Sequence, residues 1–305
     1  MGVDLGGTKI EAVVVCVDEH DALTELARRR VATERDQGYE AILGRTIDLV
    51  RTTAADAGVD SASVPIGIGM PGGVTRRGGL VKNSNTVCLN GRPFHADLER
   101  ILGRRVVFEN DANCFALAET RLGAARPYRD GVVFGVILGT GVGAGVVIRG
   151  EIWSGAQGIA GEWGHQGVWA GRPDARPCYC GGRGCLERYA SGPAVEADYA
   201  GRAGVHLELA EIAARRETDP HAAAAIEELV DSFGRGLANV LDILDPSAVV
   251  IGGGVSNLEL LYHEGSARVA QHVLNDELTT PILRHALGDS AGVLGAALLS
   301  LTSRS

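Results

Sequence analysis

Two stretches of the chain share one pattern of apolar and polar positions. Residues 2–15 read GVDLGGTKIEAVVV, and residues 135–148 read GVILGTGVGAGVVI. Each contains an apolar run, a turn rich in glycine and threonine, and a second apolar run, which together predict a β-hairpin. The recurrence half a chain apart predicts a duplicated domain in which each copy opens with such a hairpin. The alternative is a coincidence between two ordinary hairpins.

Helical periodicity marks two longer segments. Residues 39–57 are mostly helix formers, with apolar side chains gathered on one side at Ile42, Leu43, Ile47 and Val50. Residues 220–246 repeat apolar positions every three or four residues, at Ile226, Val230, Phe233, Leu237, Val240 and Leu244. Pro220 and Pro246 mark where this second helix should begin and end. Strands and helices in this arrangement predict an α/β protein.

The stretch 248–257, AVVIGGGVSN, predicts a buried strand that leads into a glycine turn. Gly253 and Gly254 in this turn are candidates for contact with the adenosine of a nucleotide, or they simply form a tight turn. No linker or low-complexity segment interrupts the chain. We therefore expect domains that pack across a cleft rather than domains joined by a tether.

Length and composition narrow the classes of protein. A chain of 305 residues predicts about two domains. Hydrophobic residues make up 45% and charged residues 22%, which is ordinary for a globular protein. The net charge of −9 and the lack of a basic tract argue against a nucleic-acid binder. The chain shows neither a signal core nor an apolar run long enough to span a membrane, so we expect a cytoplasmic protein.

The two glycine turns have the composition of anion sites. Gly139, Gly141 and Ala144 formally match the dinucleotide fingerprint, but that motif must lead into a helix, and a strand-like run follows here. Neither turn has the G-K-[ST] ending of a Walker A loop. Bare backbone N–H groups, with the hydroxyls of Thr8 and Thr140, can nevertheless surround phosphate. Two such turns facing each other would suit a triphosphate.

Asp111 is the candidate for acid–base chemistry. Within 109–123, Phe115, Ala118 and Leu122 follow helical spacing, and Asp111 falls at the start of this helix. One interpretation makes it an N-cap, because aspartate is favoured there. The other makes it the carboxylate that orients an attacking hydroxyl and accepts its proton late in phosphoryl transfer.

A cysteine cluster predicts a metal site. Cys178-x-Cys180-x4-Cys185, with His165 upstream, supplies three thiolates and one imidazole. In a reducing compartment such a cluster more often binds metal than forms disulfides, and this set completes a tetrahedral zinc site. Four protein ligands leave no open position, so the zinc would be structural; the alternative is that these are ordinary loop cysteines. The remaining cysteines, Cys16, Cys88 and Cys114, are expected to be buried as small hydrophobic residues.

Polar residues beside this cluster are candidates for substrate binding. A metal-bound imidazole keeps a second ring nitrogen, so His165 can serve both the metal and a substrate hydroxyl. Glu162 and Glu187 flank the cluster and can accept further hydroxyl bonds. The ordinary alternative for each glutamate is a solvated surface charge.

These motifs together resemble one protein family. With DLGGTK, ENDAN, GTGVGAG, GEWGH and CYCGGRGC in this order, the chain resembles the ROK-family sugar kinases from residue 2 to about residue 300. The resemblance implies an α/β, actin-like ATPase fold (RNase H-like) with two α/β domains around a central cleft. It implies domains at 1–111 and 112–291, with a C-terminal helix at about 292–305 that packs back on the first domain. It also implies a homodimer that uses ATP, Mg²⁺ and a structural Zn²⁺ and does not bind nucleic acid or membranes.

The resemblance assigns roles residue by residue. It places Asp4, Gly6, Gly7, Thr8 and Lys9 in the first phosphate turn, and Gly139, Thr140, Gly141 and Gly143 in the second. It makes Asp111 the catalytic base, and it assigns sugar contacts to Asn85, Asn110, Asp111, Glu162, His165 and Glu187. The implied zinc ligands are His165, Cys178, Cys180 and Cys185. The loop between Gly164 and Cys178 is specific to this chain, and no contacts are assigned to it.

The sugar is less clearly indicated. The run 82–98, KNSNTVCLNGRPFHADL, and the later PCYCG favour the fructokinase/mannokinase branch and therefore fructose. NDANCFALAE and VILGTGVGAG are equally close to N-acetylglucosamine kinases, and glucose is a third candidate. The family also includes sugar-responsive repressors, which carry a helix-turn-helix ahead of the first glycine turn. Because Asp4 is the fourth residue here, we expect a kinase.

Overall fold

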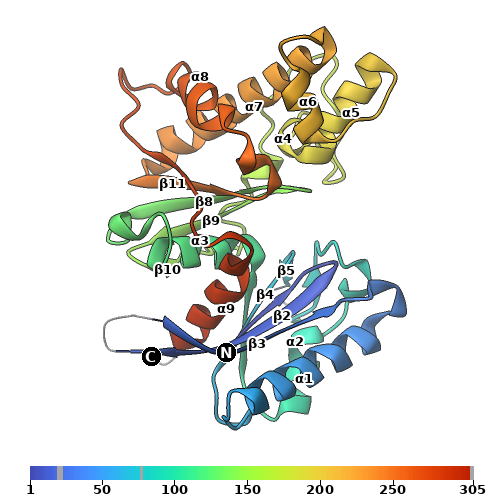
Figure 1. Ribbon diagram of the computed structural model, residues 1–305, viewed down its shortest axis with the longest axis vertical. Helices are drawn as coiled ribbons and strands as arrows, with labels where there is room; N and C mark the ends of the chain where they lie inside the picture. The colour runs from blue at the N-terminus through green and yellow to red at the C-terminus, as the bar shows by residue number, and fades with distance from the viewer. Residues whose placement is uncertain (19–22, 76–77, 303–305) are drawn as a thin grey trace. The chain divides into compact units, whose positions relative to one another are not determined.

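The structure is a computed structural model in which residues 1–18, 23–75 and 78–302 are described. The chain divides into two compact units (Figure 1). The first unit contains Met1–Ala118 and Asp289–Ser305, and the second contains Glu119–Gly288. The expected boundary after residue 111 thus falls later, inside helix α3 (Asp111–Arg121). The reason is packing: a Cβ added to Gly295 would overlap the carbonyl group of Cys114, so the start of α3 lies tightly against a helix of the first unit.

A five-stranded sheet forms the centre of the first unit, in the order β3-β2-β1-β4-β7. Its strands are β1 (Gly2–Leu5), β2 (Lys9–Val17), β3 (Leu23–Ala32), β4 (Ile66–Met70) and β7 (Val106–Asn110). The first three strands are antiparallel, and β4 and β7 run parallel to β1. A separate two-stranded ribbon pairs β5 (Gly73–Val74) with β6 (Val81–Lys82).

Helices cover both faces of this sheet (Figure 1). They are α1 (Tyr39–Asp56), α2 (Phe94–Leu102) and α9 (Ala291–Thr302). The unit also contains the short helices η1 (Arg35–Gln37) and η2 (Val87–Leu89), and η7 (Gly288–Ser290) lies at its boundary in the sequence. Side chains alternate between the faces of a strand. Val3 and Ile68 accordingly join the core under α1 and α2, whereas Gly2 and Gly67 face α9, where an added Cβ would overlap its backbone.

The second unit repeats the sheet of the first. Its order is β10-β9-β8-β11-β12, formed by β8 (Val132–Leu138), β9 (Val142–Ile148), β10 (Glu151–Ile152), β11 (Ala248–Gly252) and β12 (Ile282–Arg284). Again the first three strands in sequence are antiparallel, and the last two run parallel to the first. Both units open with the predicted glycine-turn hairpin, so the duplicated architecture expected from the sequence is observed.

The core of the second unit lies between its sheet and helix α7 (Pro220–Leu244). This helix follows the predicted span closely. It begins where the Asp219 carboxylate accepts hydrogen bonds from the N–H groups of His221, at 2.8 Å, and Ala222, at 3.3 Å, and it ends at Asp245 in a left-handed conformation. The other helices are η3 (Arg126–Tyr128), η4 (Trp163–His165), α4 (Glu187–Ala190), α5 (Gly192–Ala203), α6 (Leu209–Arg215), η5 (Gly254–Asn257), η6 (Leu261–Gly265) and α8 (Ser266–Ala270).

Two expectations about exposure can be compared with this fold. The prediction of buried isolated cysteines holds for Cys114 but is wrong for Cys16, which is exposed, and for Cys88, which is half-buried. Cys16 pairs with Thr24 near the loop that joins β2 to β3, beyond the β-bulge at Val14/Val15, where the side chains of β2 are no longer fully buried. Within the described ranges, no helix has both the length and the apolar character needed to cross a bilayer.

Candidate functional site

The first glycine turn, Gly6 to Thr8, is held by a threonine that the sequence did not single out. The Gly6 N–H donates to the carbonyl oxygen of Lys9 at 2.9 Å. Thr33, which directly follows β3, donates from its hydroxyl to Gly6 O at 2.7 Å and from its N–H to Thr8 O at 2.9 Å. Thr33 is fully buried. It fixes the turn from the neighbouring strand, and no local sequence pattern signals this role.

The structure places Asn85 beside this turn. A Cβ added to Gly7 would lie 3.4 Å from the amide oxygen of Asn85. The glycine therefore leaves room for the asparagine side chain. One predicted sugar-binding residue and the first glycine turn thus adjoin within a single unit.

Asn110 and Asp111 stand where β7 ends and α3 begins. The Asn110 side chain donates to Gly72 O at 2.9 Å and accepts from the Ala112 N–H at 2.9 Å. The Asp111 carboxylate accepts from the same Ala112 N–H at 2.9 Å. The helix start therefore has a second acceptor beside Asp111, so capping alone does not explain the aspartate.

Asp4 has an unusual electrostatic environment. Its pKa is raised to about 7, first by burial and then by the negative charges of Asp111 and Glu11, with Lys9 and Arg30 opposing. Burial disfavours the charged carboxylate, and nearby like charges add to that effect. The Asp111 carboxylate is thus close enough to Asp4 to contribute to the raised pKa of Asp4.

Lys9 is the first residue of β2 and takes part in an ion-pair cluster. Glu11 is only 1% exposed and accepts from Arg28 at 2.7 Å and from Arg30 at 2.8 Å. The Lys9 ammonium lies 3.9 Å from Glu11 and 3.5 Å from Asp289. The lysine predicted for the first phosphate turn is therefore held by carboxylates in this structure.

Three backbone segments converge at the second glycine turn, Gly139 to Gly141. The Gly139 N–H donates to Gly141 O at 2.9 Å, and Gly139 O accepts from the N–H of Gly192, the first residue of α5, at 2.9 Å. A Cβ on Gly139 would lie 3.9 Å from the nitrogen of Gly254. Gly253 has φ +86°, and a side chain there would overlap the end of β8, so only glycine fits. The 253–254 turn, the start of α5 and the second glycine turn thus form one surface.

Gly143 lies outside this turn. It is the second residue of strand β9, and its carbonyl oxygen accepts from the indole N–H of Trp163 at 3.2 Å. A strand, not a helix, follows the turn. This confirms the sequence argument that rejected a dinucleotide fingerprint, because that motif must lead into a helix. Gly143 therefore connects β9 to the segment that carries His165.

Glu187, the first residue of α4, is bound to the second glycine turn. One oxygen of its carboxylate accepts from the Val142 N–H at 2.9 Å. A Cβ on Gly141 would lie 2.8 Å from that same oxygen. A glutamate predicted to bind sugar and a turn predicted to bind phosphate are thus in direct contact, within one unit.

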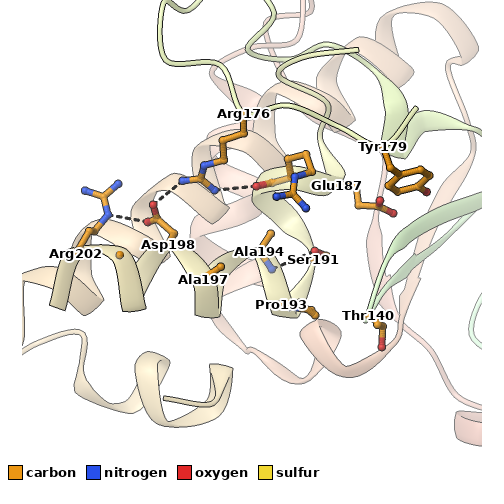
Figure 2. Close-up of a pocket in the computed structure, with 12 residues that line it drawn as sticks. Thr140, Arg176, Tyr179, Glu187, Ser191, Pro193, Ala194, Ala197, Asp198 and Arg202 are labelled. Atoms are coloured by element: carbon orange, nitrogen blue, oxygen red, sulfur yellow. Dashed lines mark hydrogen bonds and ion pairs between the residues drawn. The ribbon is translucent and has the colours of Figure 1, made fainter. Parts of the chain in front are cut away.

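A pocket of about 530 Å³ opens beside this contact. It is lined by Thr140, Arg176, Tyr179, Glu187, Arg188, Ser191, Pro193, Ala194, Ala197, Asp198, Gly201 and Arg202. Figure 2 shows Tyr179 and Glu187 near Thr140 at one end. At the other end Arg176 donates to Asp198 at 2.6 Å. The pocket therefore runs from the second glycine turn along α5.

The cysteine cluster has the dimensions of a metal site. One ligand atom from each of His165, Cys178, Cys180 and Cys185 lies within 4.8 Å of all the others. The His165 Nδ1 to Cys178 Sγ and the Cys180 Sγ to Cys185 Sγ distances are both 3.6 Å. Tetrahedral zinc with Zn–S bonds of 2.3 Å would place two sulfurs about 3.8 Å apart. The four residues therefore fit a tetrahedral zinc ion.

A tight turn shapes this cluster. Cys178 donates its N–H to Gly182 O at 2.9 Å, and Gly182 donates its N–H to the sulfur of Cys180 at 3.4 Å. That donor lowers the pKa of the Cys180 thiol, whereas burial raises the pKa of Cys185 to about 12. The exposed sulfur of Cys180 is thus more easily ionised than that of Cys185 before a metal binds.

The second nitrogen of His165 meets a residue that the sequence did not suggest. Its Nε2 lies 3.1 Å from the hydroxyl of Tyr179, and the two rings meet edge to face. Burial, then the carboxylate of Glu187, and also Cys178 and Glu162, raise the pKa of Tyr179. The phenol therefore lies among the predicted sugar-binding residues of this unit.

The loop between Gly164 and Cys178 is anchored on α7. The Trp169 indole donates to the Ser232 hydroxyl at 2.8 Å, and its ring lies between the guanidinium groups of Arg172 and Arg235, each 4.4 Å from the ring centre. Arg172 also donates to Glu228 at 2.8 Å. The aromatic and basic side chains in the middle of this loop thus hold it in place.

Comparison with known proteins places this architecture in a family. The model of the ROK family matches residues 1–303. The chain belongs to the ROK family. Its ROK relatives include the N-acetyl-D-glucosamine kinase of Photobacterium profundum, 37% identical over 308 residues that cover 98% of each chain. The N-acetyl-D-glucosamine kinase of Yersinia pseudotuberculosis is 39% identical over 311 residues, 99% of each chain.

Solved ROK structures share the fold. The ROK hexokinase from Thermus thermophilus gives a TM-score of 0.87 at 33% identity, covering 99% of this chain and 97% of that one. A ROK glucokinase from Streptomyces griseus, in complex with glucose and AMPPNP, gives 0.77 at 31% identity, covering 99% of both. The expected α/β, actin-like ATPase fold is therefore confirmed.

Proposed function

We propose that this ROK protein is an ATP-dependent sugar kinase that transfers the γ-phosphoryl group of Mg-ATP to a sugar hydroxyl, with the 6-hydroxyl as the expected acceptor. The observation that carries the proposal is the hydrogen bond between Glu187 and the Val142 N–H. It joins a carboxylate suited to sugar hydroxyls to a turn suited to phosphate. Donor and acceptor sites that adjoin are what phosphoryl transfer requires, because the reaction depends mainly on positioning.

N-acetyl-D-glucosamine is the acceptor we favour. The relatives described above are named N-acetyl-D-glucosamine kinases and match nearly the whole chain. Fructose, favoured by the 82–98 motif, finds no support among these relatives and becomes the weaker candidate. Glucose is kept as a competing acceptor because the similar glucokinase structure contains it.

The nucleotide is assigned to the second unit. The second glycine turn, the 253–254 turn and the N-terminus of the 12-residue helix α5 meet there. Backbone N–H groups at a helix start favour phosphate oxygens. Ser191 and Thr140 line the same pocket and add hydroxyls. We assign the phosphates of ATP to this surface and the adenosine to the 253–254 side.

The metals have separate assignments. Asp4 presents carboxylate oxygens, the ligands that Mg²⁺ prefers, and a bound cation would offset the burial and the neighbouring negative charges that raise its pKa. Zinc is assigned to His165 and the three cysteines, where its four protein ligands leave no place for substrate. When bound, zinc would hold the loop and orient the imidazole. It would take no part in phosphoryl transfer.

Asp111 is proposed as the base. Its carboxylate, at the first position of α3, would accept the proton of the attacking sugar hydroxyl late in the transfer, as that oxygen becomes acidic. Asn85, Asn110, Glu162, His165 and Glu187 would orient the remaining hydroxyls. A homodimer is proposed on the family resemblance, and light scattering would test it.

The test is sugar-dependent ADP release with Mg-ATP. Five sugars are compared: N-acetyl-D-glucosamine, glucose, fructose, mannose and N-acetylmannosamine. We expect N-acetyl-D-glucosamine to give the highest kcat/KM of the five. Asp111→Ala should lower kcat at least about 100-fold, while ATP affinity and Tm stay near the wild-type values because Asn110 still caps α3. Asp130→Asn, at an exposed position, is the control. Turnover of Asp111→Ala within tenfold of wild type removes Asp111 as the base, and no ADP release with any sugar removes the kinase.

A further inference from the structure

The side chain of Tyr179 has no packing role that would explain its position. It is 78% exposed, yet its hydroxyl lies 3.1 Å from His165 Nε2 and it lines the pocket beside Glu187 (Figure 2). Its backbone lies between Cys178 and Cys180, two members of the metal cluster. The ring is therefore held at its base and is otherwise open to solvent.

Side chains of the preceding loop, between Gly164 and Cys178, are engaged elsewhere, in contrast to Tyr179. Trp169 and Arg172 are bound to α7. Arg176 donates to Asp198 of α5. Tyr179 alone among these aromatic and basic side chains points toward the predicted sugar-binding residues. Its contact with His165 is thus a feature of the site and not of loop anchoring.

The chemistry of this contact matches that of a sugar hydroxyl. His165 Nδ1 faces the sulfur of Cys178 at 3.6 Å, so a metal bound there leaves the ring proton on Nε2. That N–H donates to the phenol oxygen, and the phenol O–H can donate to a carboxylate. A sugar hydroxyl has the same one donor and two acceptor positions. Either the phenol or a sugar hydroxyl can accept the hydrogen bond from His165 Nε2, but the two groups cannot occupy that position together.

We propose that Tyr179 substitutes for a sugar hydroxyl before the sugar binds: its phenol occupies His165 Nε2 beside Glu187, and the sugar displaces it. This inference rests on the proposed sugar kinase function. Sugar binding then exchanges one hydrogen bond of His165 for another, so the affinity is lower than it would be for an unoccupied imidazole. Tyr179 is accordingly a specificity-determining residue, because only a sugar that presents a hydroxyl at this position recovers the bond.

The opposite role, in which Tyr179 stays in place and binds the sugar directly, predicts the opposite sign. Removal of the phenol oxygen strengthens sugar binding if the oxygen competes with the sugar and weakens it if the oxygen contacts the sugar. One protein hydrogen bond has a small net free energy, which corresponds to a change of about two- to tenfold in Kd. Tyr179→Phe changes only this oxygen and keeps the ring.

The experiment is calorimetric titration of N-acetyl-D-glucosamine and glucose into zinc-loaded protein without nucleotide. Tyr179→Phe is expected to lower the Kd about two- to tenfold, with zinc content and Tm unchanged. Tyr179→Ala should change the Kd in the same direction. Tyr128→Phe, in η3 and outside the pocket lining, is the matched control.

Three results would overturn the proposal. An unchanged Kd for Tyr179→Phe shows that the phenol does not compete with sugar, and a raised Kd makes Tyr179 a direct sugar contact. If the wild-type protein binds and phosphorylates no sugar, the proposed function fails and this inference fails with it. By contrast, if the wild type is active and the Kd of Tyr179→Phe equals that of the wild type, only the role of Tyr179 is rejected.

Discussion

Replacing Glu119 by glutamine should destabilise the second unit by about 3 kcal/mol. Glu119 lies on α3 and is fully buried. One carboxylate oxygen accepts from the N–H groups of Ala286 at 3.1 Å and Leu287 at 2.9 Å. The other accepts from Ala124 at 2.9 Å and from Ala286 at 3.0 Å. A single side chain thus satisfies three backbone donors from two distant parts of the sequence.

The magnitude follows from the donors that lose an acceptor. Glutamine keeps one oxygen and presents an NH₂ group where the other was, so at least one of the three buried N–H groups faces another donor. Each such unsatisfied group costs about 1–3 kcal/mol, and the bonds that remain lose the assistance of the negative charge. A loss of about 3 kcal/mol corresponds to a fall in Tm of about 6–12 °C for a unit of this size.

The assay is thermal unfolding followed by calorimetry and circular dichroism. Glu264→Gln is the matched control, because Glu264 is exposed and forms an ion pair with Arg216 at 2.6 Å, an interaction worth at most about 1 kcal/mol. If Glu119→Gln melts within about 2 °C of wild type, the argument from unsatisfied donors is refuted.

Two further predictions concern the metal cluster and the first unit. Cys180→Ser should lose most bound zinc and lower Tm, because metal binding energy is also folding energy. Atomic emission measures the zinc content, and melting curves measure Tm. Cys16→Ser, at an exposed thiol, is the control and should change neither the zinc content nor Tm. Asp4, with its pKa raised to about 7, binds protons more tightly in the folded than in the unfolded chain. Its contribution is therefore fully present below about pH 4 and lost as the pH rises toward 7. Urea unfolding of the metal-free proteins checks this. Between about pH 4 and 7 the free energy of unfolding of the wild type should fall relative to that of Asp4→Asn. Parallel pH profiles of the two proteins would contradict the burial of the Asp4 carboxyl.

The elements that depend on local pattern were predictable from the sequence. Both glycine-turn hairpins and the helices at 39–57 and 220–246 were expected, because the period of apolar residues reports directly on strand or helix. The metal cluster was also recognisable, since its ligands lie close together in the sequence. The repeated hairpin predicted that the two domains are related, but it did not predict the order of the strands in their sheets. That order depends on pairing between segments that are distant in the sequence.

Residues that act through tertiary contact were not predictable. Thr33, Tyr179 and Glu119 carry no local signal, and each acquires its role from a partner on another element. Cys16 was expected to be buried because its neighbours are apolar, but the sequence does not reveal the β-bulge at Val14/Val15, beyond which the side chains of β2 are no longer fully buried. Gly143 matched a motif yet lies in a strand, since a motif does not fix where a turn ends.

The discontinuity of the first unit has a consequence for biosynthesis. Helix α9 covers the sheet face that carries Gly2 and Gly67, but the ribosome makes α9 only after the whole of the second unit, Glu119–Gly288. The second unit is continuous and can fold as soon as it emerges, whereas the first unit waits with one face of its sheet uncovered. During synthesis the half of the protein made first is thus the half completed last, and that uncovered face is where chaperones would be expected to bind the nascent chain.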